Sequence, residues 1–311
     1  MRTYLVTGGC GFIGSHLCRA LMARGDSVRV LDDLSTGSLA NLPTGARFFE
    51  GNVADPAAVR CALCGVDGCF HLAAIASVQL SNRDWLNTHR TNLTGAIAVF
   101  EAATMRDPPT PVVYASSAAV YGDCASLPID EAAKTQPISS YGADKLGCEQ
   151  HAWAAKCTRR LISVGLRLFN VYGPGQDPKS PYSGVISIFC ERIRQGLAIE
   201  VFGDGGQTRD FIFVADVVEA MVRAMDLRPA DAPVFNICTG RGTPVLELAR
   251  TIAGLCRQNL KIAFRPGRAG EIRHSRGDPT AAQQALGLVE PADIGTGLAA
   301  TLAWLGGQSA V

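Results

Sequence analysis

The chain has 311 residues, of which 47% are hydrophobic and 18% charged, and its 29 Lys and Arg against 28 Asp and Glu leave a net charge of +1. This composition excludes a disordered chain, and the balanced charge argues against a broad basic surface for nucleic acid. No run approaches the roughly 20 apolar residues that span a bilayer, and the glycine-rich motif starting at Gly8 leaves no room for a signal peptide. We therefore expect a cytoplasmic protein that binds neither nucleic acid nor membrane.

The first half of the chain alternates short apolar runs with longer helical patterns. In chain order, we expect strands at 3–8, 27–32, 47–52, 68–74, 111–117 and 162–170, and helices at 12–24, from Pro56, at 84–104 and at 141–156. Strands of about six residues that alternate with helices of a dozen or more build βαβ units. This half therefore predicts a parallel sheet with helices on both faces.

The pattern changes after Asn170, where residues 171–184 hold three prolines and three glycines and predict a long loop. Beyond it we expect a helix at 184–195, a glycine-rich turn at 202–207, a strand at 234–240 and a loop with four arginines at 265–278. The predicted fold is α/β, with a doubly wound parallel sheet and a smaller mixed α/β C-terminal substrate domain. We expect the sheet domain to comprise 1–170 and about 211–240, and the smaller domain about 171–210 and 241–311.

A glycine-rich turn joins the first strand to the first helix. Gly9, Gly11 and Gly14 satisfy GxGxxG, and Gly8 with the latter two gives GxxGxxG. Missing Cβ atoms let the backbone approach a pyrophosphate at the helix N-terminus. Asp32 ends the second strand 18 residues past Gly14, where a carboxylate can bind an adenosine ribose and repel a 2′-phosphate. These features predict a Rossmann-type site for NAD rather than NADP; the alternative is a tight turn beside a solvated aspartate.

Cysteine usage is compatible with free thiols, because the count of 11 is odd. Cys61 and Cys64 form a CxxC with Cys69 nearby, but zinc would need a fourth ligand that is not found locally. We expect instead that these cysteines are small buried residues on a helix and the next strand.

Tyr141 and Lys145 stand four residues apart on a predicted helix and so share one face. A free tyrosine titrates near about 10, and a cation about 4 Å away at an effective dielectric near 20 stabilises its anion by roughly 4 kcal/mol. Lys145 and a positively charged nicotinamide could thus make Tyr141 a base near neutral pH. Ser117, just past the fifth strand, could bond the same substrate hydroxyl. The alternative for an isolated pair of this kind is surface decoration.

Other cofactor contacts are expected at strand ends, where the amide of Asn52 could reach adenine and small residues after His71 let a dinucleotide approach. His71 itself could be a base, although we expect a histidine packed at a strand end. The residues expected to bind the cofactor are Gly8, Gly11, Phe12, Ile13, Gly14, Asp32, Asn52, Val53, Leu72, Ala73, Ala74, Tyr141 and Lys145.

Together these motifs resemble the extended short-chain dehydrogenase/reductase family, specifically its NAD-dependent nucleotide-sugar 4-epimerases. The resemblance runs from "TGGCGFIGSHL" through "RLFNVYGP" and "GQTRDFIFVAD" to "GEIRHSRGD". It implies that Tyr141 takes the proton of the sugar 4-hydroxyl while the C4 hydride passes to NAD. The 4-keto sugar then turns over, and the hydride returns to its opposite face. Lys145 would tune Tyr141, and Ser117 would bond the hydroxyl.

The resemblance also implies a UDP-sugar site. Asn170 would touch the sugar-diphosphate, and Arg209 and Arg268 would clamp the phosphates as bidentate guanidinium groups, although either arginine could instead form a salt bridge at the rim. The residues implied to bind substrate are Ser77, Ser117, Asn170, Gly184, Val201, Arg209, Arg268 and Ser275.

Two departures from relatives, and one position that varies among similar epimerases, are informative. Ala118 and Ala119 stand where related 4,6-dehydratases carry an Asp-Glu pair, which leaves epimerisation rather than elimination. Asn52 replaces an aspartate common in relatives. Ser275 is a small residue at a position that, in similar epimerases, lies beside the sugar 2-substituent, so we expect UDP-N-acetylglucosamine to be accepted.

The same residues leave two other functions open, and the resemblance implies an oligomeric assembly. The chain could be a dehydrogenase or reductase that exchanges free cofactor, or a non-catalytic NAD sensor, which the retained Tyr and Lys disfavour. The resemblance also implies a homodimer through a four-helix bundle of the helices at 84–104 and 141–156. Within these helices, the residues that could pack there or face the core are Ile97, Val99, Phe100 and Trp153.

Overall fold

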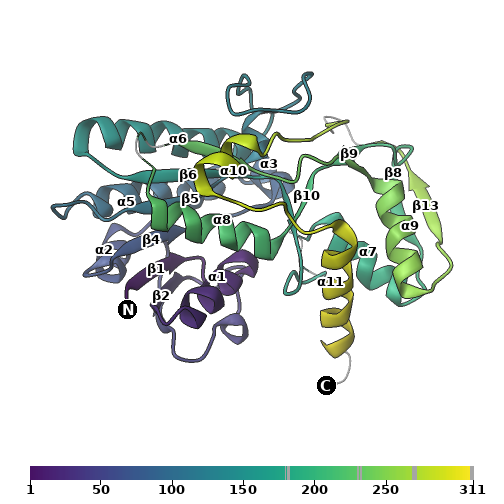
Figure 1. Ribbon diagram of the computed structural model, residues 1–311, viewed down its shortest axis with the longest axis horizontal. Helices are drawn as coiled ribbons and strands as arrows, with labels where there is room; N and C mark the ends of the chain where they lie inside the picture. The colour runs from purple at the N-terminus through teal and green to yellow at the C-terminus, as the bar shows by residue number, and fades with distance from the viewer. Residues whose placement is uncertain (179, 181–182, 230, 232, 268–271, 309–311) are drawn as a thin grey trace.

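A seven-stranded parallel sheet forms the centre of the larger part of the computed structural model, which describes residues 1–178, 180, 183–229, 231, 233–267 and 272–308 (Figure 1). Its strand order is β11-β6-β5-β4-β1-β2-β3, with every neighbouring pair parallel. The strands are β1 (Thr3–Thr7), β2 (Ser27–Asp32), β3 (Arg47–Glu50), β4 (Gly68–His71), β5 (Val112–Ser117), β6 (Ser163–Leu168) and β11 (Val234–Ile237). The predicted doubly wound α/β sheet is confirmed.

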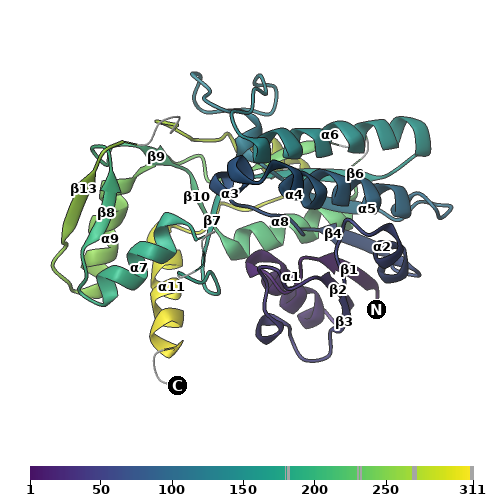
Figure 2. The same cartoon turned by 180° about the vertical axis from the view of Figure 1, so that it is seen from behind.

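Helices cover both faces of this sheet, as Figures 1 and 2 show from opposite sides. One layer holds α1 (Phe12–Ala23), α8 (Val214–Leu227) and α10 (Thr280–Leu286), and the other holds α2 (Pro56–Leu63), α5 (Gly95–Ala103) and α6 (Ser140–Arg159). Side chains of a strand alternate between the two cores: Tyr4 and Val6 pack with the first layer, and Leu5 with the second.

α8 and α10 add to the sheet region beyond what the sequence predicts. α8 directly follows β10 (Phe211–Phe213), and no side chain caps its first turn. The apolar run therefore carries no break that would separate strand from helix. α10 packs on α8 and β11, although residues 280–286 lie in the range expected for the smaller domain.

The predicted single helix at 84–104 is wrong in detail. An extra helix, α3 (Val78–Arg83), precedes the segment, which itself forms α4 (Trp85–His89), a π-helical turn η2 (Arg90–Thr94) and α5. Asn92 lies fully buried in the π turn, where its amide accepts a hydrogen bond from Ile75 N (2.8 Å) and donates one to Ile75 O (3.1 Å). A π turn inserts one residue into the helical repeat, which the apolar spacing does not reveal.

The smaller part has its own apolar core. It contains α7 (Val185–Arg194), α9 (Val245–Cys256) and α11 (Ile294–Gln308), with β8 (Ile199–Phe202) paired to β13 (Ile262–Arg265). The strand predicted at 162–170 divides at Phe169, because the chain leaves the main sheet as β7 (Asn170–Tyr172), which pairs with β10. β9 (Thr208–Arg209) pairs with β12 (Thr243–Pro244). Two short 3-10 turns, η1 (Leu39–Asn41) and η3 (Ala118–Val120), complete the elements.

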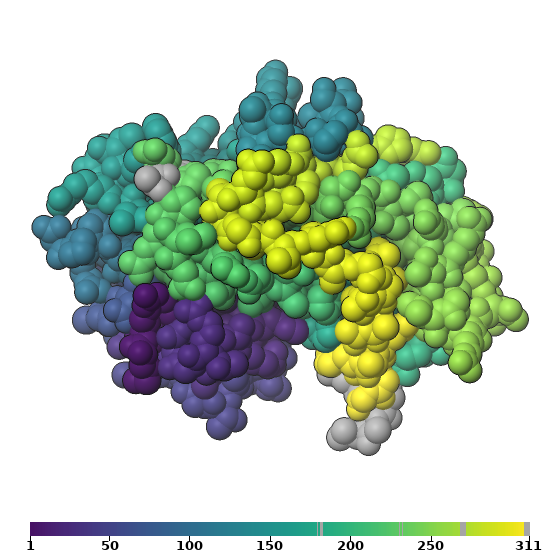
Figure 3. Space-filling view, in the orientation of Figure 1, coloured from purple at the N-terminus to yellow at the C-terminus, as the bar shows by residue number. Residues whose placement is uncertain are grey.

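The two parts are joined by chain that crosses between them several times. In Figure 3 the C-terminal segment, drawn in yellow, runs over the face of the molecule from α10 to α11. Among the described residues, no helix combines the length and apolar character that a membrane span requires.

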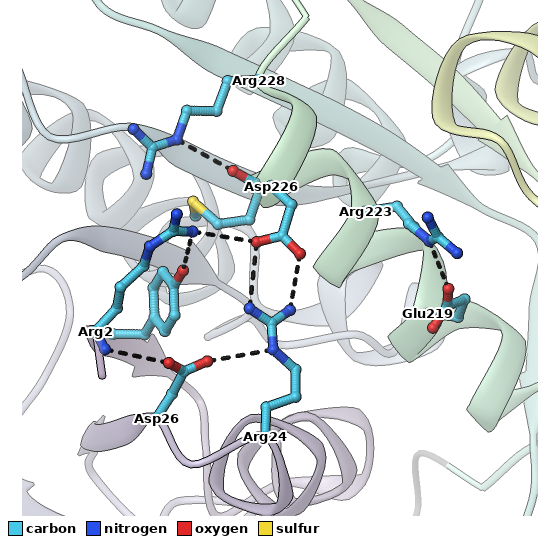
Figure 4. Close-up of polar contacts among 9 residues, drawn as sticks. Arg2, Arg24, Asp26, Glu219, Arg223, Asp226 and Arg228 are labelled. Carbon is cyan, nitrogen blue, oxygen red and sulfur yellow. Dashed lines mark hydrogen bonds and ion pairs between the residues drawn. The ribbon is translucent and has the colours of Figure 1, made fainter.

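A network of ion pairs fastens α1 to α8 (Figure 4). The Arg24 guanidinium donates to both carboxylate oxygens of Asp226 at 2.9 and 3.2 Å, and Arg2 Nη1 donates to the same carboxylate at 3.3 Å. Asp26 bonds the backbone N–H of Arg2 and pairs with Arg24. Single exposed pairs of this kind contribute little, whereas a network of several charges contributes more.

Candidate active site

The carboxyl ends of the parallel strands define one edge of the sheet, and most of the predicted cofactor and catalytic residues gather along this edge. The glycine-rich turn follows β1, Asp32 ends β2, Leu72 to Ala74 follow β4, and Ser117 ends β5. In open parallel sheets this edge is where ligands bind. The chain therefore folds so that residues distant in sequence share one candidate site.

The turn between β1 and α1 requires glycine for steric reasons. Gly8 has φ +72°, and a Cβ there would lie 2.7 Å from Ala73 N. A Cβ at Gly14 would lie 2.1 Å from the Gly8 carbonyl oxygen. Gly11 precedes α1 and offers no side chain to cap the first-turn N–H groups. Phe12 and Ile13 begin that helix. Together the glycine turn at residues 8–14 and the start of α1 form a glycine cradle that fits a pyrophosphate.

Asp32 holds the cradle to the end of β2. Its carboxylate accepts hydrogen bonds from Cys10 N and Leu34 N, both at 2.9 Å. Burial raises the pKa of Asp32, and the two hydrogen bonds act against that rise. The carboxylate thus lies beside the glycine turn, where the adenosine ribose of a dinucleotide bound there would lie.

The end of β3 carries the two other residues expected near adenine. The Asn52 amide donates to Asp33 at 3.0 Å and accepts from Ala54 N at 2.8 Å. Val53 is buried. The Asn52 side chain therefore closes its own loop, and contact with adenine stays a prediction for both residues.

Thr7 organises the end of β4. Its hydroxyl oxygen accepts hydrogen bonds from Leu72 N and Ala73 N, both at 3.2 Å, which occupies its lone pairs. The hydroxyl therefore donates to His71 Nδ1 at 2.8 Å and leaves the ring in its Nε2–H form. Burial lowers the pKa of His71 to about 3. This neutral ring, 2% exposed, is the packed strand-end histidine that the sequence favours.

Tyr141 and Lys145 lie in the first two turns of α6, one helical turn apart. Ser139 caps this helix by accepting a hydrogen bond from Gly142 N at 3.1 Å. Lys145 is buried, and its ammonium lies 5.8 Å from the centroid of the Tyr141 ring. The ammonium also donates to the Ala115 carbonyl oxygen at 2.8 Å. Lys145 therefore joins the tyrosine-bearing helix to β5.

Ser117 lies against the same end of α6. Its hydroxyl accepts a hydrogen bond from Ala119 N at 3.1 Å and caps η3. A Cβ on Gly142 would lie 2.5 Å from the Ala119 carbonyl oxygen, so the first turn of α6 packs directly on η3. The fold thus brings the Ser117 segment next to Tyr141 and Lys145, while alanines occupy the two positions after the serine.

A buried ion pair that the sequence analysis missed lies beneath these residues. The Arg167 guanidinium donates to both oxygens of Glu149, at 2.9 and 2.7 Å, and Ser116 Oγ donates to the same carboxylate at 2.5 Å. Glu149 follows Lys145 by four residues on α6. That spacing, which extends the face of Tyr141 and Lys145 by one turn, is the signal that could have found it.

The residues expected to bind substrate are spread over several elements. Ser77 caps α3 by accepting a hydrogen bond from Leu80 N (3.1 Å), and Gly184 precedes α7. Asn170 is exposed at the start of β7. Val201 is 1% exposed in the core of the smaller part, so its side chain faces away from solvent.

Two more of these residues lie side by side. Arg209 is in β9, and Ser275 N donates to the Thr208 carbonyl oxygen at 3.2 Å. Arg268 lies outside the described residues.

The expected burial of the CxxC cysteines is wrong. Cys61 and Cys64 are exposed and Cys69 is buried. Val59, Ala62 and Leu63 form the inner face of α2, which leaves Cys61 on its outer face. In the part of the chain that the structure describes, all eleven cysteines are free, and no group of three or more His, Cys, Asp or Glu could hold a metal ion.

Comparison with known proteins is consistent with this geometry. The model of the "NAD dependent epimerase/dehydratase family" matches residues 4–238. The chain is 36% identical to a UDP-glucose 4-epimerase of Mycolicibacterium smegmatis, over 99% of this chain and 100% of the relative.

Two solved structures extend the comparison. A Thermotoga maritima UDP-glucose 4-epimerase with UDP-glucose superposes with a TM-score of 0.94, at 35% identity and 99% coverage of both chains. A Methanobrevibacter ruminantium UDP-N-acetylglucosamine 4-epimerase in complex with UDP-N-acetylmuramic acid gives a TM-score of 0.93, at 31% identity and 99% coverage of both chains.

Proposed function

The chain belongs to the NAD dependent epimerase/dehydratase family, which confirms the expected cofactor, and from this premise we propose that it is a UDP-sugar 4-epimerase. The observation that carries the proposal is the packing of Tyr141 and Lys145 against the Ser117 segment, at the same sheet edge as the glycine cradle. The UDP-glucose and UDP-N-acetylglucosamine 4-epimerases that it resembles along nearly their whole length support this assignment.

Proton transfer is assigned to Tyr141. Its phenolate oxygen takes the proton of the sugar 4-hydroxyl and returns it when the ketone is reduced. The Lys145 ammonium stabilises the phenolate by charge, and Ser117 Oγ orients the 4-oxygen by a hydrogen bond. NAD, when bound, supplies the acceptor for the C4 hydride and the means of returning it. Because the 4-keto sugar presents either face to the same hydride donor, its rotation inverts the carbon.

The segment after Ser117 limits the chemistry to epimerisation. Ala118 and Ala119 form η3 and carry no group that could donate a proton. Elimination of the sugar 6-hydroxyl would need an acid at this position. We therefore propose that the 4-keto sugar returns to a hexose and is not dehydrated.

UDP-N-acetylglucosamine is proposed as an accepted substrate beside UDP-glucose. Ser275 is small and only partly buried, and its backbone is tied to the β9 strand that holds Arg209. A serine leaves more room than a bulky side chain beside the sugar 2-substituent. A solved UDP-glucose 4-epimerase and a solved UDP-N-acetylglucosamine 4-epimerase superpose on the chain with TM-scores of 0.94 and 0.93.

The test is incubation of the purified enzyme with a panel of UDP-sugars, followed by proton NMR for inversion at C4. The proposal requires inversion without net production or consumption of NADH. Steady NADH formation identifies a dehydrogenase instead, and inversion of UDP-glucose without any inversion of the acetamido sugar contradicts the proposed breadth.

A homodimer is proposed through α4 and α6. Trp85 and Leu86 on α4 are 65% and 79% exposed, Trp153 on α6 is 53% exposed, and the two helices pack together. Large apolar side chains left exposed on neighbouring helices are typical of an interface. Val99 and Phe100 are instead buried in the core beneath them, so they contribute no interface area.

A further inference from the structure

Asp210 lies between β9 and β10 and is completely buried. It directly follows Arg209, which the resemblance assigns to the substrate phosphates. The sequence analysis gave Asp210 no role, and the proposed mechanism does not use it. A buried carboxylate is costly unless its oxygens are bonded, so its partners show what it holds together.

Four hydrogen bonds converge on this carboxylate. Oδ1 accepts from Thr239 N (2.8 Å) and Thr239 Oγ1 (2.7 Å), and Oδ2 accepts from Gly240 N (3.0 Å) and Gly277 N (3.2 Å). The donors come from the turn after β11 and from the segment that follows Ser275. Two chain segments far apart in the sequence are thus tied to the residue after Arg209.

The backbone of Asp210 adds a third connection. Its carbonyl oxygen accepts a hydrogen bond from Asn170 N at 3.0 Å. The carboxylate meanwhile fixes Gly277, two residues past Ser275. Asn170, Arg209 and Ser275, which the resemblance implicates in binding the diphosphate and the sugar, therefore all connect to this one residue.

A carboxylate can accept all four of these hydrogen bonds, and an amide cannot. Each carboxylate oxygen of Asp210 accepts two hydrogen bonds, whereas an asparagine has one acceptor oxygen and an NH2 group. In Asp210→Asn the NH2 group would oppose either the two N–H groups of Gly240 and Gly277 or the two donors of Thr239. In the first case Gly277 would lose its bond to residue 210, and in the second the turn after β11 would keep only the bond from Gly240 N.

We propose that Asp210 is a positioning residue that fixes Asn170, Arg209 and the Ser275 segment relative to one another and so builds the wall that binds the nucleotide-sugar diphosphate. This inference rests on the proposed UDP-sugar substrate. Asp210 touches neither the reacting atoms nor the glycine cradle, so its effect falls on substrate affinity.

The experiment compares the holoenzyme with its Asp210→Asn variant. UDP binding is measured by calorimetry, KM and kcat with UDP-glucose by C4 inversion, and bound NAD after heat release. Because hydrogen bonds to a charged group are stronger than neutral ones, we expect UDP affinity to fall and KM to rise by about tenfold or more. The kcat value should stay within about threefold and NAD content should not change, because the cradle and Tyr141 are intact. Unchanged UDP affinity in a folded variant overturns the proposal.

Two further sets of variants separate positioning from general damage. Asp278→Asn removes a carboxylate of the same segment that, among the residues the structure describes, bonds Thr280, and this variant should bind UDP like the wild type. If Asp210→Asn does not fold, Thr239→Val removes one donor to the carboxylate and should weaken UDP binding about threefold, whereas Thr239→Ser should restore it. Equal UDP binding by Thr239→Val and Thr239→Ser then refutes the role of Asp210. A wild-type enzyme that does not bind UDP refutes the proposed function itself.

Discussion

The Lys145 ammonium donates a 2.8 Å hydrogen bond to the carbonyl oxygen of Ala115. Ala115 lies two residues before Ser117 in β5, so the lysine that faces Tyr141 also fixes the distance between α6 and the serine. The buried ammonium therefore has two roles, one electrostatic and one structural.

Replacement of Lys145 by methionine removes the cation and this hydrogen bond while keeping an unbranched side chain that is one heavy atom shorter. A charge about 4 Å from a phenolate contributes about 4 kcal/mol at an effective dielectric near 20. We expect C4 inversion at pH 7 to slow by about a hundredfold or more. The exposed Lys134 gives the control, Lys134→Met. Full activity of Lys145→Met at pH 7 would show that the lysine is not the electrostatic partner.

The Glu149–Arg167 pair predicts a large effect on stability. Glu149→Gln leaves the buried Arg167 charge without its bidentate partner, and breaking a buried ion pair costs about 3–5 kcal/mol. Urea unfolding should show a loss of this size. The exposed pair of Glu219 and Arg223 on α8 (Figure 4) supplies the control, since Glu219→Gln should cost at most about 0.5 kcal/mol. Similar losses for the two variants would mean that the buried pair contributes no more than a surface pair.

His71 predicts an acid dependence of stability. Burial lowers its pKa from 6.5 to about 3, so the unfolded chain binds more protons than the folded one between these values. The stability that comes from keeping His71 neutral is complete above pH 6.5 and is lost as pH falls. At pH 5 the free energy of unfolding is lower by about 2 kcal/mol for this reason. In His71→Asn, the fall in unfolding free energy from pH 7 to pH 5 should be smaller by this amount. If the unfolding free energies of wild type and variant fall in parallel between pH 7 and pH 5, His71 is not the cause of the acid dependence. His16, whose pKa burial also lowers, remains in both proteins.

The proposed dimer predicts a sedimenting particle of twice the 32.8 kDa chain mass. Leu86→Glu and Trp153→Glu place charges on the exposed face of α4 and α6, where pairing would bury them at high cost. Both variants should shift the enzyme to single chains. Val289→Glu, at an 80% exposed position before α11, should leave the dimer intact. Single chains in the wild type at micromolar concentration would rule the dimer out.

Local patterns were sufficient to predict the main sheet. Glycine spacing, short apolar runs and the four-residue interval between Tyr141 and Lys145 are properties of contiguous sequence. They located β1 to β6, the cradle and the tyrosine-bearing helix. α8 was missed because it begins without a capping residue directly after a strand, and the π turn was missed because it alters the helical period for only five residues.

The buried polar contacts could not be predicted from the sequence, because they form only when the fold brings distant residues together. Glu149 and Arg167 are 18 residues apart, and Asp210 and Gly277 are 67 apart. Glu149, Arg167 and Asp210 look like ordinary surface charges in the sequence, because what keeps each of them buried is a partner brought by another element. The same limit applies to Val201, whose place in the core depends on how β8 packs on α7 and α9.

The central claim is that the Tyr141 phenol carries the proton during inversion at C4. The most direct measurement is proton NMR of UDP-glucose incubated with wild type and Tyr141→Phe, each with its bound NAD quantified first. The account predicts inversion by the wild type, and a loss of at least about a thousandfold in the variant at equal NAD content, since a phenyl ring cannot accept a proton. Inversion at a similar rate by both proteins would contradict it.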